Sequence, residues 1–195
     1  LAGWPRVYKR IFDIFGALFG LALCSLPMVL IAVAIKFSDG GPVFYRQRRI
    51  SYGRRAFSML KFRTMIHDAE RAGRTLAVRN DPRCTRVGRW LRSWSLDELP
   101  QLLNVLVGEM SLVGPRPERP EMLAKIKDEV PGFPMRLKVR AGMTGWAQVN
   151  GFRGGAGRTS FRKRLQYDLY YLNNWSPLLD LRIMAMTVPG LLGDR

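Results

Sequence analysis

Residues 95–117 read SLDELPQLLNVLVGEMSLVGPRP, a stretch that combines a carboxylate pair, an apolar helix pattern and an arginine between two prolines. The adjacent acids Asp97 and Glu98 open a run whose leucines recur at helical spacing. A short apolar strand is predicted over 110–113, and the following prolines restrict the backbone around Arg116. Carboxylates at a helix start, together with a fixed guanidinium group, indicate phosphate chemistry.

The same stretch also has a purely structural interpretation as a capped helix. Ser95, followed three residues later by Glu98, fits a capping box, and Asp97 would lie near the positive end of the helix dipole. That position predicts a lowered pKa for Asp97 and therefore an ionised carboxylate. A cap does not require the neighbouring cations Arg92 and Arg116, so both interpretations stay open here.

The composition restricts the partners of the chain. Its 195 residues suffice for one domain with a core, and 32 Lys and Arg against 15 Asp and Glu give a net charge of +17. Such a surface attracts anions: nucleic acid, acidic lipid head groups or phosphorylated substrates. Cys24 and Cys84 are expected to be free thiols in a reducing compartment. His67 is the only histidine, which argues against a catalytic triad or a histidine metal site, and it is expected at the surface.

An apolar run covers residues 11–35, and its uncharged part is about long enough to cross a bilayer. A transmembrane span, a helix that enters the membrane and returns, and a buried core helix are the three alternatives. Pro27 lies inside the run and should kink or break the helix, and the Ser25 hydroxyl could bond the backbone groups that a kink frees. Basic residues flank both ends, so a straight span would violate the positive-inside bias. We therefore favour a re-entrant helix broken at Pro27.

The remainder of the chain alternates short strands with helices, which predicts an α/β (α+β) fold. A strand over residues 56–65 would place Lys61 and Arg63 on one face, either as a solvated edge or as contacts for a diphosphate. Arg92 lies on a basic helical face beside tryptophans, a pattern typical of a membrane surface or of a solvated charge stripe. Helices are predicted over residues 85–94, 118–130, 161–175 and 178–192, and the polar residues 66–82 are expected to form a helix followed by a loop.

A glycine-punctuated segment near residue 145 carries three further candidates. Trp146, Gln148 and Asn150 alternate as they would along a strand, which puts a ring and two amides on one face. Such a face suits a base or a sugar, or it is a core tryptophan beside surface amides. The glycine-rich residues 153–158 lack the spacing of a P-loop.

Five sequence blocks occur together and in order, and the ordered set is far more specific than any one of them. They are KRIFD at 9–13, KFRTM at 61–65, SLDELP at 95–100, VGPRP at 113–117 and GWAQVN at 145–150. In this order the chain resembles the bacterial sugar transferases, the monotopic polyprenyl-phosphate phosphoglycosyl transferases, over residues 7–192. One departure is that members often carry Ser-Pro at the helix break, whereas Leu26 separates Ser25 from Pro27 here.

The resemblance implies an enzyme on the cytosolic face of the bacterial inner membrane. It would transfer a sugar-1-phosphate from a UDP-sugar to polyprenyl (undecaprenyl) phosphate and release UMP. Asp97 would be the nucleophile and a ligand of the cofactor Mg²⁺, with Glu98 as its partner. Lys61, Arg63, Arg92, Arg116, Trp146, Gln148 and Asn150 are the expected substrate-binding residues.

The expected organisation is a membrane helix over residues 1–37 followed by a small cytosolic catalytic domain, with interfacial helices, over residues 38–195. Bilayer lipids are expected partners, nucleic acid is not, and a homo-oligomer is left open. Two alternatives remain: a basic nucleic-acid-binding module, for which no motif is found, and a membrane scaffold whose acids only cap a helix.

Overall fold

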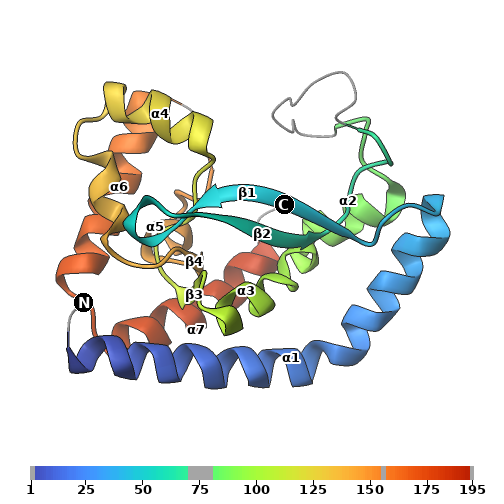
Figure 1. Ribbon diagram of the computed structural model, residues 1–195, viewed down its shortest axis with the longest axis horizontal. Coiled ribbons are helices and arrows are strands. Elements are labelled where there is room, and N and C mark those ends of the chain that lie inside the picture. Colours follow the sequence, from blue (N-terminus) through green and yellow to red (C-terminus); the bar gives the residue numbers. More distant parts are fainter. Residues whose placement is uncertain (1–2, 70–80, 155–156, 194–195) are drawn as a thin grey trace.

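The computed structural model describes residues 3–69, 81–154 and 157–193, and side chains up to residue 188. Its longest element is α1 (Trp4–Asp39), which runs along the base of the molecule in Figure 1. The helix has a proline in its first turn and ends at Gly40, whose left-handed conformation lets its N–H bond to the Lys36 carbonyl.

The predicted break at Pro27 is not confirmed, because α1 continues through this residue as one helix. Its axis changes direction partway along, so the helix is bent rather than interrupted (Figure 1). Ser25 Oγ donates to the Ala22 carbonyl at 2.9 Å. That acceptor is not the Leu23 carbonyl, the group that loses its helical donor when residue 27 is proline. The predicted role of Ser25 is therefore met only in that its hydroxyl bonds to the helix backbone.

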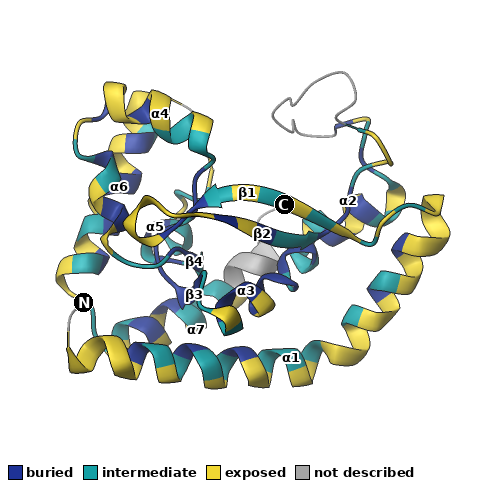
Figure 2. Ribbon diagram, viewed as in Figure 1, coloured by how far each residue is buried: buried dark blue, intermediate teal, exposed yellow. Residues whose placement is uncertain are grey.

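Most of the apolar surface of α1 is not covered by the protein, as Figure 2 shows. It is the one helix among the described residues that is long and apolar enough to cross a membrane. Within its most apolar 18-residue stretch, 11% is buried. A core helix of a soluble domain would be mostly buried. The structure is thus consistent with membrane association and speaks against the core-helix alternative. Its large exposed side chains include Trp4, Phe15, Phe19, Leu23, Leu26 and Phe37.

Polar contacts fasten the N-terminal half of α1 to the rest of the fold. Lys9 Nζ lies 3.2 Å from Asp13 and 2.9 Å from Asp180 of α7 (Pro177–Gly193). Asp13 also accepts hydrogen bonds from Ser111 Oγ at 2.8 Å and from the Leu112 amide at 3.0 Å. Both members of this pair are buried, so their partners come from protein rather than from water or lipid.

The C-terminal half of α1 packs on the same domain through apolar contacts. Ile31 and Ile35 form a buried cluster with Phe62 of β2 (Ala56–Phe62) and Leu91 of α2 (Arg86–Ser93). Both halves of α1 therefore contact the same folded unit, while much of the helix surface that does not face this unit stays exposed.

Two small sheets lie above α1. Strands β1 (Phe44–Ile50) and β2 (Ala56–Phe62) form an antiparallel hairpin in which Phe44 pairs with Phe62 and Ile50 with Ala56. β3 (Ser111–Val113) pairs in parallel with β4 (Gly142–Thr144). The sequence predicts a first strand only over residues 43–45, whereas β1 is longer because the basic residues 46–49 continue the hairpin.

Helices surround these sheets and confirm the predicted α+β class (Figure 1). The helices expected over residues 85–94, 118–130, 161–175 and 178–192 are all present. Of the one expected over residues 66–82, residues 67–69 form a turn and residues 70–80 lie outside the described part. The remaining helices are α3 (Gln101–Val107), α4 (Pro120–Glu129), α5 (Trp146–Val149) and α6 (Arg158–Asn173).

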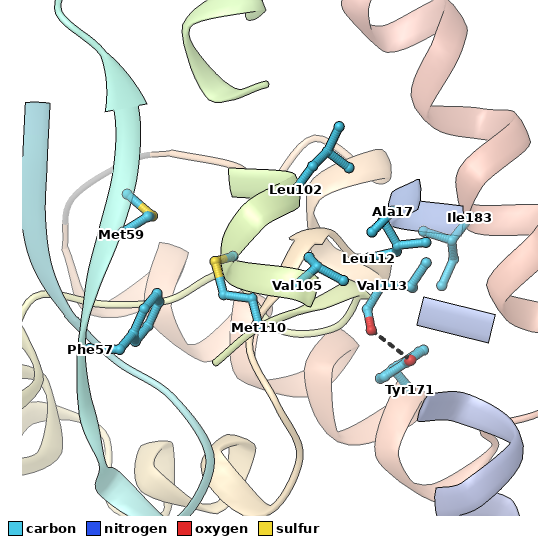
Figure 3. Close-up of a cluster of buried hydrophobic side chains, with 10 residues drawn as sticks. All are labelled: Ala17, Phe57, Met59, Leu102, Val105, Met110, Leu112, Val113, Tyr171 and Ile183. Atoms are coloured by element: carbon cyan, nitrogen blue, oxygen red, sulfur yellow. Dashed lines mark hydrogen bonds between the residues drawn. The ribbon is translucent and has the colours of Figure 1, made fainter. Parts of the chain in front are cut away.

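The main core joins the hairpin, α3 and the parallel pair (Figure 3). Phe57 and Met59 extend from β2 toward Met110, and the Tyr171 hydroxyl donates to the Val113 carbonyl at 3.1 Å. This packing fixes β2, which carries Lys61, and β3, which is followed closely by Arg116. The other core side chains are Ala17, Leu102, Val105, Leu112 and Ile183.

Candidate active site

The two acids lie on a tight turn and not in the first turn of an α-helix. Asp97 and Glu98 belong to a 3-10 turn (Leu96–Glu98), and α3 begins only after Pro100. In a continuous α-helix from residue 95, the Pro100 ring would meet the Leu96 carbonyl. Ser95 adopts the left-handed conformation, with φ 54°, a strained geometry for a residue other than glycine. The predicted capping box is therefore wrong, since the Ser95 side chain makes no cap hydrogen bond.

Glu98 is held by three cations from different parts of the chain. Its Oε1 lies 2.8 Å from Lys61 Nζ and 3.3 Å from Arg116 Nη2, and its Oε2 lies 3.3 Å from Arg153 Nη2. Asp97 has one long ion pair, in which Oδ2 is 3.9 Å from Lys61. No hydrogen bond to the Asp97 carboxylate is made within residues 3–69, 81–154 and 157–188. Both carboxylate oxygens of Glu98 are thus paired with cations, whereas the Asp97 carboxylate can still accept a further partner.

These environments move the two pKa values in opposite directions. Burial raises the pKa of Asp97, the negative charge of Glu98 adds to the rise, and Lys61 opposes it without cancelling it. Burial would also raise the pKa of Glu98, but Arg116, Lys61 and Arg153 together hold that pKa well below its ordinary range. The lowered pKa predicted for Asp97 is therefore wrong, because desolvation outweighs any dipole effect.

Close backbone approach in the parallel sheet brings Arg116 to the acids. A Cβ on Gly142 would lie 2.0 Å from the Gly114 amide nitrogen, and one on Gly145 would lie 2.1 Å from the Gly114 carbonyl oxygen. Only glycine fits at such contacts. The approach allows Arg116 Nη1 to donate to Gln148 Oε1 at 3.1 Å, so these two predicted residues do meet.

A buried ion cluster holds the backbone of Arg116 from behind. Arg136 Nη2 donates to the Arg116 carbonyl at 2.9 Å, and the same guanidinium lies 3.2 Å from Glu118 and 2.8 Å from Asp168. Arg164 Nη1 lies 2.5 Å from Glu118. Burial raises the pKa of Asp168 to about 6 even with two cations beside it. The cluster connects α6 to the proline-bounded corner, a link between distant residues that the sequence pattern does not predict.

The structure separates Lys61 and Arg63, which were predicted to share one face. β2 ends at Phe62, and the Arg63 guanidinium pairs with Asp39 at the end of α1. Arg92 Nε donates to Thr64 Oγ1 at 2.8 Å, and its charge lowers the pKa of Asp97 in opposition to burial. Arg63, Thr64 and Arg92 instead line a separate cavity of about 300 Å³.

Trp146 and Asn150 do not face the acids. The segment expected to be a strand is the short helix α5, so alternate residues do not share a side. Trp146 stacks on Tyr170 with ring centroids 5.9 Å apart and lies under the Arg182 guanidinium. Asn150 Nδ2 donates to the Trp146 carbonyl at 2.7 Å, which closes the end of the helix. Both residues have structural partners, and only Gln148 of the three reaches the site.

Two residues of the site were not predicted. Arg153 Nη1 donates to Ser95 Oγ at 3.0 Å while its Nη2 pairs with Glu98, so it holds the strained turn and the acid together. A cation at the start of the glycine-rich segment 153–158 was the available signal. Asn104 accepts from the Leu60 amide at 2.9 Å and donates to the Ser58 carbonyl at 2.9 Å, which fixes the strand beside Lys61. The other expectations for reactive groups are met, because Cys24 and Cys84 are free and His67 is exposed.

The donor groups suit Mg²⁺ only in combination with a phosphate ligand. No group of three or more acidic, histidine or cysteine side chains that could hold a metal occurs in the described part of the chain. Mg²⁺ is usually held by one or two carboxylates together with substrate phosphates and water. Since Glu98 is already paired through both oxygens, Asp97 is the carboxylate that remains for such an ion.

The two buried acids lie within a set of cations, in a domain that packs on a long and largely exposed apolar helix, and this arrangement suits a phosphate-bearing ligand. The profile of the bacterial sugar transferase family matches residues 4–194, and the chain belongs to this family.

Curated relatives support the assignment. A UDP-glucose:undecaprenyl-phosphate glucose-1-phosphate transferase of Xanthomonas campestris is 48% identical over 170 residues, which cover 86% of this chain and 35% of the relative. A protein of the same name from Escherichia coli is 42% identical, over 96% of this chain and 41% of the relative. The exopolysaccharide production protein PSS of Rhizobium leguminosarum is 43% identical, over 93% and 94%. The chain thus spans 35% and 41% of the first two relatives and nearly all of the third.

Proposed function

We propose that the chain transfers a sugar-1-phosphate from a UDP-sugar to polyprenyl (undecaprenyl) phosphate and releases UMP. The observation that carries the proposal is the unequal pairing of two adjacent acids: Glu98 contacts three cations, whereas Asp97 has one long ion pair. The less stabilised carboxylate is the better nucleophile, so Asp97 is assigned the attack and Glu98 the positioning of the cations. The relatives' names support the acceptor and make UDP-glucose the first donor to test.

In the first half-reaction an Asp97 oxygen attacks the sugar-bearing phosphorus of the donor. The bond from that phosphorus to the bridging oxygen breaks, and UMP leaves with the electron pair. Lys61, Arg116 and Arg153 offset negative charge on the diphosphate, which otherwise repels an anionic attacker. The product is an aspartyl phosphosugar, a covalent intermediate that divides the transfer into two displacements.

In the second half-reaction a phosphate oxygen of the acceptor attacks the same phosphorus. The bond to Asp97 breaks, the carboxylate is regenerated, and a new diphosphate joins the sugar to the lipid. Because both substrates use one set of cations in turn, the proposal implies ping-pong kinetics.

We assign Mg²⁺ to Asp97 and the phosphates of the bound donor. When bound, it would neutralise charge on the donor diphosphate and so reduce its repulsion of the carboxylate. The spare coordination capacity of Asp97 supports this assignment.

We also propose that α1 enters the cytosolic face of the inner membrane and returns to it. A straight 36-residue helix would be about 54 Å long, and a span would separate its ends across a hydrocarbon core of about 30 Å. Contacts from both halves of α1 to one domain support the re-entrant arrangement. The division into residues 1–37 and 38–195 stays a prediction, and α1 itself extends to Asp39.

Cysteine labelling tests this placement. Trp4→Cys and Phe37→Cys, each at an exposed end of α1 and each in a chain lacking Cys24 and Cys84, should both react with a membrane-impermeant maleimide added from the cytosolic side. Leu23→Cys, in the middle of the exposed apolar face, should be protected. Protection of one end, with labelling of that end only from the opposite side, would establish a straight span instead.

The activity is tested by mixing the full chain in a nanodisc with undecaprenyl phosphate and a panel of UDP-sugars, and measuring UMP. Release that depends on both substrates is expected, and EDTA should stop it until Mg²⁺ is restored. A scaffold whose acids are only structural would release no UMP with any donor.

The pH dependence of the first half-reaction should show which acid reacts. Asp97 must be ionised to attack, and its raised pKa places the acid limb of the rate profile above the pH expected for an ordinary aspartate. Glu98→Gln removes a charge that raises the pKa of Asp97 and frees Lys61 to lower it. The limb should therefore move to lower pH in this variant, although the rate itself falls. An unmoved limb, with Glu121→Gln on α4 as the exposed control, would show that Asp97 is not the titrating group.

A further inference from the structure

A chamber of about 390 Å³ lies beside the acid pair, between α5, α7 and the parallel sheet. Its walls are mainly apolar, and Leu112, Met143, Val149, Met184 and Met186 supply most of that surface. Glu98 and Arg153 line its polar end. The volume is within the range of small-molecule sites, and the methionines can adapt to an irregular apolar ligand.

The few polar groups of the wall are already paired with protein. The hydroxyls of Thr144 and Thr187 lie 2.7 Å apart and bond to each other. The Gln148 amide accepts from Arg116 and donates to the Met143 carbonyl at 3.2 Å. A nucleoside or sugar would find few unpaired partners on this wall, whereas a hydrocarbon needs none.

The polar end of the chamber complements an anionic head group. Lys61, Arg116 and Arg153 carry three positive charges around Glu98, and Asp97 adds only one further acid. A phosphate attached to an apolar chain would therefore place its charge at the cations and its first carbons against the methionines.

The chamber also adjoins the apolar helix. Leu112 of its wall contacts α1 so closely that a Cβ on Gly16 would lie 2.4 Å from Leu112 Cδ1. At the rim, Val188 of α7 is 59% exposed. A ligand in the chamber can thus remain continuous with the apolar surface formed by α1 and α7.

We propose that this chamber binds the first isoprene units of the polyprenyl phosphate acceptor, with its phosphate at Arg153 and Arg116. The identity of the acceptor rests on the proposed function, whereas the location rests on the chamber itself. The donor nucleotide is excluded from it and approaches the acid pair from elsewhere.

Photolabelling tests the location without requiring turnover. The full chain in nanodiscs is irradiated with a farnesyl phosphate that carries a diazirine on its first isoprene unit, and labelled peptides are sequenced. Label is expected within residues 143–149 and 184–188. Excess undecaprenyl phosphate should suppress it, whereas undecaprenol or inorganic phosphate alone should not.

Met186→Trp fills the chamber and should reduce labelling about tenfold, corresponding to about 1.4 kcal/mol of binding free energy. It should raise the KM for undecaprenyl phosphate while leaving the KM for the UDP-sugar unchanged. Val188→Trp at the exposed rim gives the same test if the first variant fails to fold, and Leu178→Trp, on the same helix but outside the chamber, is the matched control.

Labelling elsewhere, or a rise in the KM for the UDP-sugar instead, would overturn the assignment. Correct labelling in a chain that releases no UMP would reject the proposed function and leave the chamber as a prenyl phosphate site. Normal UMP release with label only outside the chamber would reject the chamber alone.

Discussion

Asp97→Asn is expected to lower UMP release at least about 10³-fold, because an amide is a far poorer nucleophile than a carboxylate. The variant should fold as the wild type does. Since the pKa of Asp97 is raised, the folded state already disfavours its charge, and a neutral isostere relieves that penalty. Initial rates of UMP release, measured together with a thermal melt, separate the chemical loss from unfolding.

Asp128→Asn, an identical change at an exposed position of α4, is the control and should retain full activity. Retained turnover in Asp97→Asn would remove this residue from the chemistry. Glu98→Gln should lose less activity, because Glu98 positions the cations and does not attack phosphorus.

Arg136→Met is expected to destabilise the fold by about 3–5 kcal/mol, the usual effect of removing one partner from a buried ion pair. Arg136 is 1% exposed. It forms ion pairs with Glu118 and Asp168 and donates a hydrogen bond to the Arg116 carbonyl. Methionine fills similar volume but removes one of the two arginines that act on Glu118 and Asp168, so Arg164 no longer shares their charge with Arg136. Chemical denaturation monitored by tryptophan fluorescence measures the loss.

The destabilisation by Arg136→Met should depend on pH, because Asp168 titrates. Its folded-state pKa of about 6 exceeds the ordinary 3.8, so protonation favours the folded state and its contribution to stability is lost as pH rises through about 6. Without Arg136 the charged form of Asp168 is still less favourable. The loss of folding stability in Arg136→Met should therefore be larger at neutral pH than at pH 5. Arg162→Met, an exposed change on α6, should have little effect at either pH. A deficit that does not depend on pH would mean that Asp168 is not coupled to Arg136.

The sequence predicts the elements of this fold well, because each depends on local periodicity. The apolar helix around residues 11–35 and the strand that bears Lys61 follow from local pattern, although the predicted break at Pro27 is not confirmed. The helices over residues 85–94, 118–130, 161–175 and 178–192 were predicted in the same way. The first strand was predicted only over residues 43–45, because the basic residues that follow show no strand pattern of their own, and pairing with β2 extends it to Ile50.

Local pattern was misleading where tertiary contacts decide the outcome. Ser95 fits a capping box in sequence, yet Pro100 and the hydrogen bond from Arg153 favour a strained turn. The pKa of Asp97 follows burial, which no local pattern shows. The alternation of Trp146 and Asn150 suggested a strand, although the segment folds as a helix.

Local context explains which site residues could be predicted, and contacts between distant segments explain which could not. Lys61 and Arg116 were identified because each stands in a distinctive local context, and both do contact Glu98. Arg153 and Arg136 reach the same region from loops and helices that are remote in sequence, so only the folded structure brings them there.

The most direct test is peptide mapping of the enzyme after it is mixed with UDP-glucose and no acceptor, then quenched at low temperature. We expect one equivalent of UMP and the added mass of a hexose phosphate on the peptide that contains Asp97, and we expect that mass to be lost when undecaprenyl phosphate is added. An adduct on another residue, or lipid-linked product formed with no adduct at any time, would contradict it.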